Sequence, residues 1–335
     1  MSKLDFNYLL EQKTQLIDQF MYYDCAYFNA LHIEICSYCN LKCSHCPRTI
    51  LNYDSKNRFM DFAVFKNIIN SVSKNGVNLH IQGLGEPTMH PQFLDFIEYS
   101  SFCPNISNIA ITSNCLYKNS NDYNLYFDKG LTQLVISLDS LHQDKVNILR
   151  AGTNAGKLLD NISAISAKHS HKLAINTIIN RINYHELDNI AAFLINNNIR
   201  RWSIEHELIV SNDASSTKHN YLNFDSNNKQ SLNLAELKDL SVIINAKYSK
   251  YFDLTTNFYT HPTKKNRCTM PWDILHISAR GYIVPCCMYF IDSYMNFGSI
   301  TDIDINEIWL NDHFQHFRNT MYNSKPCICT KCPLY

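Results

Sequence analysis

The stretch Cys39-Asn40-Leu41-Lys42-Cys43-Ser44-His45-Cys46 decides how the rest of the sequence is interpreted. It places three thiols at spacings of three and two intervening residues, directly after the apolar run 31–35. Cysteine thiolates are the usual ligands of iron–sulfur clusters, and a cubane cluster has four iron corners. Three thiols on one loop can therefore hold three irons and leave the fourth open to a small molecule.

Other metal sites fit this loop less well. A structural zinc site joins two cysteine pairs through a long loop, whereas three residues separate Cys36-x2-Cys39 from Cys43-x2-Cys46. A bacterial ferredoxin motif spaces its cysteines in a different order, C-x2-C-x2-C-x3-C-P. A ferredoxin-type site is therefore the weaker interpretation. As a fourth ligand, Cys36 would close the cluster and make an electron carrier. We expect it instead to be a buried apolar residue, as free cysteines often are.

Composition limits the class of protein. With 335 residues and 45% hydrophobic content, the chain can bury a large core and suggests about two domains. Thirty basic and thirty acidic residues cancel, so we expect no nucleic-acid partner. The sequence has neither a membrane-length apolar stretch nor a signal peptide, so we expect no membrane partner and a cytoplasmic location. Ten of the thirteen cysteines cluster toward the two ends of the chain in metal-ligand spacings, which indicates a reducing compartment.

Strand-like and helix-like segments alternate between residues 31 and 207. The expected strands are 31–35, 77–81, 106–112, 134–138, 173–179 and 201–205. Helical spacing of apolar residues is found in 60–73, 91–101, 157–168 and 186–197. Repeated strand–helix order predicts an α/β fold, a parallel sheet with helices outside. Six units, against the eight of a closed barrel, predict a partial (β/α)6 TIM-like barrel with an open side.

The remaining segments define the expected domain organisation. Residues 1–30 are expected to form an N-terminal helical extension, 31–207 the barrel, and 208–262 a linker with a helical segment. Residues 263–335 are expected to form a small cysteine-rich α+β domain with six of the thirteen cysteines. It should contain a β-hairpin, 274–278 with 282–285, and a helix over 305–321.

A second motif, Gly83-Leu84-Gly85-Glu86-Pro87, ends the second expected strand. Glycines let a backbone approach a ligand closely, and a carboxylate beside them can receive an ammonium group. Such a turn is common and means little alone. In this order, however, the cysteine loop and the turn resemble the radical S-adenosylmethionine (radical SAM) superfamily, with its C-x3-C-x2-C loop and GGEP-type turn. Leu84 replaces one glycine, and the resemblance covers residues 31 to about 207.

The resemblance implies a cofactor site. Cys39, Cys43 and Cys46 would hold a [4Fe-4S] cluster whose open iron binds the amine and carboxylate of S-adenosylmethionine (SAM). Further implied contacts come from the glycine turn, from a position near the adenine and from strand ends: Gly83, Gly85, Glu86, His45, Ser113, Asn114, Ser137, Asp139, Arg150 and Asn176. For the strand-end residues, a hydrogen bond within the fold or a helix cap is an equally good interpretation.

The family's chemistry follows as an implication. A reduced cluster passes one electron to SAM, which releases methionine and a 5′-deoxyadenosyl radical that removes a substrate hydrogen. Cluster potentials span roughly −700 to +450 mV, and this role needs the reducing end of that range. A low-potential electron donor such as a flavodoxin or ferredoxin is therefore an expected partner.

The C-terminal cysteines resemble the SPASM/Twitch extension of this superfamily, in the form that holds one auxiliary cluster. Twelve residues separate Cys268 from Gly281 and four separate Gly281 from Cys286, while Cys329-x2-Cys332 lies near the end. The expected ligands of an auxiliary [4Fe-4S] cluster are Cys268, Cys286, Cys329 and Cys332. Cys287 and Cys327 leave the ligand set open, and zinc on the same four thiols is the main alternative.

Substrate groups are expected at the end of the sixth strand. There Glu205 and His206 would point into the barrel mouth and bind or deprotonate a substrate, with a salt-linked rim as an equal alternative. Within the family an auxiliary cluster commonly accompanies oxidation or peptide modification. The resemblance thus implies an oxidoreductase or maturase that oxidises or cross-links a peptide or protein side chain. The alternatives are dehydrogenation of a small polyol or aminocyclitol-type metabolite, and an iron–sulfur electron carrier without SAM chemistry.

Overall fold

The computed structural model describes residues 28–51, 59–72, 76–207, 230–258, 268–329 and 332. The helix expected within residues 1–30 and the polar first part of the expected linker, up to residue 229, lie outside the described residues. No helix in the described part of the chain is long and apolar enough to cross a bilayer.

A curved sheet organises the described residues, with strand order β12-β11-β10-β1-β3-β4-β5-β7-β8-β9. Neighbouring strands from β10 to β9 are parallel, whereas β10–β11 and β11–β12 are antiparallel. Its strands are β1 (Ala30–Ile33), β3 (Val77–Ile81), β4 (Ile106–Ser113), β5 (Gln133–Ser137), β7 (Leu173–Ile179), β8 (Arg201–His206), β9 (Asp253–Asn257), β10 (Ile274–Ile277), β11 (Tyr282–Val284) and β12 (Gly298–Ser299). All six expected barrel strands are present, so the predicted α/β partial barrel is confirmed.

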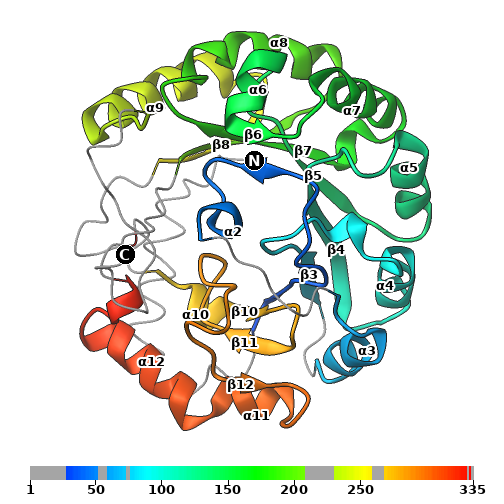
Figure 1. The fold of residues 1–335 in the computed structure, drawn as a ribbon, viewed down its shortest axis with the longest axis vertical. Helices are drawn as coiled ribbons and strands as arrows, with labels where there is room; N and C mark the ends of the chain where they lie inside the picture. Colours follow the sequence, from blue (N-terminus) through cyan, green and yellow to red (C-terminus); the bar gives the residue numbers. More distant parts are fainter. Residues whose placement is uncertain are drawn as a thin grey trace.

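Helices follow the outside of this curve, as Figure 1 shows for α3, α4, α5, α7, α8 and α9. The longer helices are α3 (Phe62–Asn70), α4 (Phe93–Ser101), α5 (Ser120–Asp128), α6 (Gln143–Leu149), α7 (Ala155–His169), α8 (Leu187–Asn196), α9 (Leu234–Tyr248) and α12 (Asp312–Asn323). Short elements are α2 (Pro47–Ile50), α10 (Met270–Asp273), α11 (Ile305–Leu310), η1 (Pro87–Met89), η2 (Ser170–Lys172), η3 (Tyr184–Glu186) and η4 (Cys327–Cys329). Asn119 and Asn233 each begin a helix with a complete capping box, which satisfies backbone donors that the helix leaves free.

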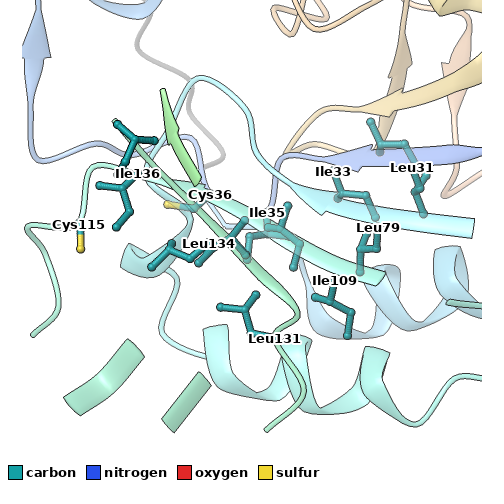
Figure 2. Packing of buried hydrophobic residues seen from close by; sticks show 14 of the residues in the cluster. Leu31, Ile33, Ile35, Cys36, Leu79, Ile109, Cys115, Leu131, Leu134 and Ile136 are labelled. Atoms are coloured by element: carbon teal, nitrogen blue, oxygen red, sulfur yellow. The ribbon is translucent and has the colours of Figure 1, made fainter. Parts of the chain in front are cut away.

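Side chains alternate along the strands, and this alternation separates the core from the barrel interior. In β7, Leu173, Ile175, Thr177 and Ile179 are buried, whereas the residues between them are partly exposed. The buried set packs against the helices because successive side chains leave opposite faces of a strand. Figure 2 shows part of this core, built from β-branched and leucine side chains of β1, β3, β4 and β5. The other set, including Asn176, therefore faces the inside of the curve.

Two strand pairings were not anticipated. β9 extends the barrel beyond the sixth strand, in parallel register with β8 from Arg201↔Asp253 to Glu205↔Asn257. The expected C-terminal hairpin is present as β10–β11, but β10 also pairs in parallel with β1, from Ala30↔Ile274 to Ile33↔Ile277. The C-terminal region therefore continues the barrel sheet.

The helix expected over 305–321 is two helices, α11 and α12. They meet at Asn311, whose side chain accepts a hydrogen bond from the Phe314 backbone N–H and so begins α12. Asn is a preferred N-cap residue because its short side chain reaches the unpaired donors of the first turn. The interruption is therefore set by one polar residue within an otherwise helical pattern.

Candidate active site

The cysteine loop, residues 39–46, follows β1 and is tied to a segment after β5. Within it β2 (Lys42–Cys43) pairs antiparallel with β6 (Arg150–Ala151), which places Cys43 opposite Arg150. The Ser44 backbone N–H also donates to the Leu149 carbonyl at 3.0 Å. Cys43 is buried, and Cys39 and Cys46 are partly buried. Hydrogen bonds of the protein itself thus fix the path of the loop.

Protein donors point at two of the three thiols. The Asn114 side chain donates to Cys39 Sγ at 3.8 Å, and Arg150 Nη1 donates to Cys43 Sγ at 3.9 Å. The Leu41 backbone N–H adds a further donor to Cys39 at 3.4 Å. Burial raises the pKa of Cys39 to about 12, while the Leu41 bond opposes that shift. Donors and a cation stabilise the thiolate, which is the form that binds metal.

The glycine turn, residues 83–87, lies directly against the chain that leads into the cysteine loop. A Cβ on Gly85 would come within 2.1 Å of the Cys36 carbonyl oxygen, so only glycine fits there. The Glu86 backbone N–H donates to the Tyr38 carbonyl at 2.6 Å. Leu84, the departure from the family's motif, contributes its backbone N–H to Glu34 Oε1 at 2.7 Å, which needs no glycine.

Glu86 is placed differently from its expected role at the SAM amine. Its carboxylate is 3% exposed and accepts hydrogen bonds from Thr88 Oγ1 at 2.6 Å, Ser113 Oγ at 2.8 Å and the Asn114 backbone N–H at 2.8 Å. Burial raises the pKa of Glu86, and these bonds oppose the rise. Both oxygens face donors from the protein, so the carboxylate ties the turn to β4. The contact of Gly83 and Gly85 with the SAM amine stays a prediction.

Asp139 and Arg150 form a buried ion pair beside the cysteine loop. Arg150 donates through Nε and Nη2 to the two Asp139 oxygens, and the Ile178 backbone N–H donates to Asp139 Oδ1 at 2.9 Å. Burial lowers the pKa of Arg150, but the Asp139 charge, the hydrogen bond to Asp139 and the thiols Cys43 and Cys46 together raise that pKa above its ordinary value. The guanidinium therefore stays charged next to Cys43. Asp139 affects Cys43 by holding Arg150 in place, and both side chains are hydrogen-bonded within the protein.

The other expected SAM contacts lie on the inner side of the barrel. Ser137 and Asn176 are adjacent in the β5–β7 register, and both are partly exposed. The Asn176 Oδ1 atom is buried and has no hydrogen-bond partner within the described part of the chain. Burial lowers the pKa of His45 to about 4, so its imidazole is neutral at physiological pH. Three thiols, nearby donors and an unpaired amide oxygen fit a cluster with a polar organic ligand.

The expected auxiliary cysteines, Cys268, Cys286, Cys329 and Cys332, come together from two distant segments. Burial and the neighbouring thiols Cys287, Cys332, Cys268 and Cys329 raise the pKa of Cys286 well above its ordinary value. The Tyr289 hydroxyl donates to the Ile328 carbonyl at 3.0 Å and so joins the two segments. Cys287 contacts the sulfur of Met270 at 3.7 Å, and Cys327 is exposed.

The zinc alternative uses the same four thiols. Tetrahedral zinc needs four ligands at about 2.0–2.3 Å from one centre, whereas a cubane cluster binds each thiolate to a different iron. Iron and zinc share thiolate ligands, so the donor set by itself fits both metals.

Glu205 and His206 leave opposite faces of β8. Glu205 is on the partly exposed face and acts electrostatically on Cys287. Burial raises the pKa of Cys287 to about 12, and the charges of Cys268 and Glu205 contribute to the rise. His206 shares the buried face with Trp202. The expectation that both side chains point into the barrel mouth is thus wrong for His206, because neighbouring strand residues alternate. Glu205 alone remains a candidate substrate group.

Two buried carboxylates near the site were not predicted from the sequence. Glu34 follows β1 and accepts backbone hydrogen bonds from Leu84, Gly85 and Ala279. Glu207 follows β8 and accepts from Asn180 Nδ2 at 2.9 Å, and burial raises its pKa. Each lies just after a strand, and an acidic residue at that position is the signal that could have identified them.

Models of two protein families match the chain. The Radical SAM superfamily matches residues 33–194, and an iron–sulfur cluster-binding domain, SPASM, matches residues 268–333. The chain is 23% identical over 332 residues to a tungsten-containing aldehyde ferredoxin oxidoreductase cofactor-modifying protein from Pyrococcus furiosus, covering 91% of this chain and 87% of that protein. It is 28% identical over 175 residues to a GTP 3′,8-cyclase from Klebsiella pneumoniae, which is 50% of this chain and 51% of that protein. The chain thus matches about half the length of that cyclase.

Solved structures share the fold. SuiB from Streptococcus suis, bound to S-adenosylmethionine, superposes with a TM-score of 0.68 and 18% identity, over 95% of this chain and 74% of SuiB. The enzyme anSMEcpe with bound AdoMet gives a TM-score of 0.68 and 16% identity, over 91% and 87% of the two chains. The cysteine loop, the barrel and both family matches agree, and the chain belongs to the radical SAM superfamily as an enzyme with a C-terminal SPASM domain, using SAM and [4Fe-4S] clusters.

Proposed function

We propose that this enzyme oxidises or cross-links a side chain of a peptide or protein substrate, and that its auxiliary cluster accepts an electron. The observation that carries the proposal is the proximity of Glu205, on the inner face of β8, to Cys287 beside the auxiliary cysteines. A substrate in the barrel mouth would then meet a carboxylate and the electron acceptor together. A related structure, SuiB bound to the precursor peptide SuiA, supports a peptide as the substrate class.

Each part of the chain has a separate role in this proposal. Cys39, Cys43 and Cys46 would hold the cluster, which together with SAM would supply the removal of a hydrogen atom from the substrate. Arg150 and Asn114 stabilise the thiolates of the cysteine loop. Completing a two-electron oxidation requires the substrate to lose a further electron and a proton. The Glu205 carboxylate is the proposed acceptor of that proton, because it faces the interior from a strand end.

A small hydroxylated metabolite is the second candidate substrate. BtrN in complex with AdoMet and 2-DOIA shares the fold with a TM-score of 0.53 and 15% identity. The spacing of Cys268, Cys286, Cys329 and Cys332 also fits a single auxiliary cluster. The same auxiliary cluster would accept the electron from either kind of substrate, so the two candidates differ in what occupies the barrel mouth.

The test measures SAM cleavage and substrate oxidation separately. Anaerobically reconstituted enzyme receives SAM, a flavodoxin or ferredoxin as electron donor, and either short precursor peptides from neighbouring genes or polyols and aminocyclitols. A peptide that stimulates 5′-deoxyadenosine formation and loses two hydrogens by mass supports the first proposal. Oxidation of a polyol or aminocyclitol with no peptide product overturns it in favour of the second.

The Glu205→Gln variant tests the proposed base. It should still cleave SAM, while product formation falls about 10²-fold, within the usual range for loss of a general base. Glu98→Gln is the matched control, because Glu98 pairs with Lys129 on the outside of the barrel and should leave both rates unchanged. Unchanged product formation in Glu205→Gln would remove Glu205 from the mechanism.

A further inference from the structure

Glu34 joins three segments that are far apart in the sequence. Its side chain is 2% exposed and directly follows β1. Oε1 accepts hydrogen bonds from Leu84 N at 2.7 Å and Gly85 N at 3.3 Å, both in the glycine turn. Oε2 accepts from Ala279 N at 3.2 Å, in the turn between β10 and β11. One carboxylate thus connects the barrel to the C-terminal hairpin.

Gly83 shows how tightly the glycine turn packs against this carboxylate. A Cβ on Gly83 would lie 2.4 Å from Cγ of Glu34 and 2.5 Å from its Cβ. Gly83 is absent from the glycines with positive φ, so its backbone would accept an alanine. Contact with Glu34 is therefore the reason that a side chain cannot be placed at Gly83.

The hairpin turn, residues 278–281, is fixed from its other side by Asp292. Ser278 Oγ donates to Asp292 Oδ2 at 2.6 Å, and Arg280 Nε donates to the same oxygen at 3.0 Å. The turn continues through β11 to Cys286, one of the expected auxiliary ligands. A shift of the turn would therefore be transmitted to Cys286 along a short segment of chain.

Burying the Glu34 carboxylate is costly, and backbone donors offset part of that cost, since burial still raises its pKa. An ionised carboxylate is stable in a protein interior only when it is paired or hydrogen-bonded. Arg48 is the charged group that acts on Glu34, and its attraction is weaker than the three backbone hydrogen bonds. In return, the carboxylate holds two turns at a fixed separation. An apolar side chain of the same size could fill the space but could not join the turns.

We propose that Glu34 is a positioning residue that couples the glycine turn to the hairpin turn, so that SAM affinity and the order of the auxiliary hairpin depend on one side chain. The proposal rests on the proposed function insofar as the glycine turn is assigned to SAM. It predicts that loss of the Glu34 side chain loosens both the glycine turn, next to the cysteine loop, and the hairpin turn, which leads to the auxiliary cysteines.

Hydrogen–deuterium exchange of cluster-free protein tests the coupling without any activity. In Glu34→Ala, the amides of residues 83–86 and 278–281 should both exchange at least tenfold faster than in the unmodified protein. Glu98→Ala, which removes a partly exposed carboxylate on the outer side, should change neither segment. Faster exchange in only one segment, or in neither, overturns the proposal.

A gentler variant covers the case in which Glu34→Ala fails to fold. Glu34→Gln keeps an acceptor for Leu84 and Gly85 but turns an amide NH2 toward the Ala279 N–H, so two donors face each other. The hairpin turn should then exchange at least threefold faster, and the glycine turn should change less. Unchanged exchange in the hairpin turn of this variant overturns the proposal.

The affinity of the holoenzyme for SAM tests the second part of the proposal, that Glu34 affects SAM binding. The affinity is measured from the change that SAM causes in the spectrum of the reduced cluster. Glu34→Ala should weaken SAM binding about tenfold with iron content unchanged, since the Leu84 and Gly85 N–H groups of the glycine turn lose their acceptor. Gly83→Ala should weaken binding similarly. Combined with Glu34→Gly, which removes both the Cβ and the Cγ that the new side chain would meet, it should add nothing to the effect of Glu34→Gly alone; additive effects overturn the proposal. If both segments loosen while SAM affinity is unchanged, the coupling stands and the assignment of the glycine turn to SAM falls.

Discussion

The two groups of cysteines are held in different ways. Cys39 and Cys43 of the cysteine loop receive donors from Asn114 and Arg150, which belong to other parts of the barrel. Around Cys286, by contrast, the neighbours that raise its pKa are further thiols. Buried thiolates repel one another, so the second group needs a metal to neutralise its charge. A bound metal would relieve this repulsion at Cys286, whereas at Cys39 and Cys43 protein donors already stabilise the thiolates.

The largest effect should come from removing cysteines of each group. Cys39→Ala, Cys43→Ala or Cys46→Ala should abolish SAM cleavage, whereas Cys268→Ala should retain SAM cleavage and lose substrate oxidation. Iron should fall from about eight to about four per chain in each case, because each cubane holds four irons. Iron and sulfide analysis with a 5′-deoxyadenosine assay checks this. Cys103→Ala is the control, and about four irons with bound zinc in the unmodified protein would contradict the auxiliary-cluster assignment.

Arg150 tests how far the first site depends on the protein. Arg150→Met leaves Asp139 buried without its cation, and breaking a buried ion pair typically costs 3–5 kcal/mol. Denaturant unfolding of the cluster-free protein measures the loss. Arg181→Ala is the matched control, because its exposed pair with Glu236 should contribute less than about 1 kcal/mol. Equal losses in the two variants would show that the Asp139–Arg150 pair does not stabilise the site.

Glu34 lies between the two sites and gives a pH-dependent prediction. Burial, opposed by backbone hydrogen bonds, raises its pKa from 4.5 to about 7. The folded protein therefore holds this proton more tightly than the unfolded chain. Its contribution to stability, up to about 3 kcal/mol, is present below pH 4.5 and is lost as the pH rises to about 7. Glu34→Gln should remove that part of the slope when unfolding is measured at several pH values; an unchanged slope would contradict it.

Cys36 should give the smallest effect. It is 1% exposed and belongs to the buried hydrophobic core, part of which Figure 2 shows. Cys36→Ala should leave iron content and SAM cleavage unchanged and cost about 1 kcal/mol of stability, as small buried truncations do. Loss of one cluster in this variant would show that Cys36 is a ligand. The first site would then have four cysteine ligands, as expected for the auxiliary cluster.

Short-range patterns predict much of the barrel and of the cysteine loop. Strand alternation and the thiol spacing are local, so the sequence alone is enough to predict β1, β3, β4, β5, β7 and β8. β9 was not expected, because Asp253-Leu254-Thr255-Thr256-Asn257 has little apolar character to separate it from a linker. The pairing of β1 with β10 joins the two ends of the chain, and no local pattern encodes such a partner.

Carboxylate roles were harder to predict than cysteine roles. Glu86 was expected to face a ligand, but Thr88 and Ser113 enclose it, and the sequence does not show which way a turn residue points. Glu34 was overlooked because its partners are backbone N–H groups, which every residue but proline carries. Thiols can be recognised by their spacing, whereas a buried carboxylate is recognised only from the donors around it.

The position of β1 between β3 and β10 has a consequence for biosynthesis. Residues 274–277 leave the ribosome long after β1, so one edge of β1 has unpaired backbone groups through most of translation. Contacts of high sequence separation also form slowly. The pairing of β1 with β10 is therefore among the last contacts of the sheet to form, and until then that backbone edge of β1 is open to solvent.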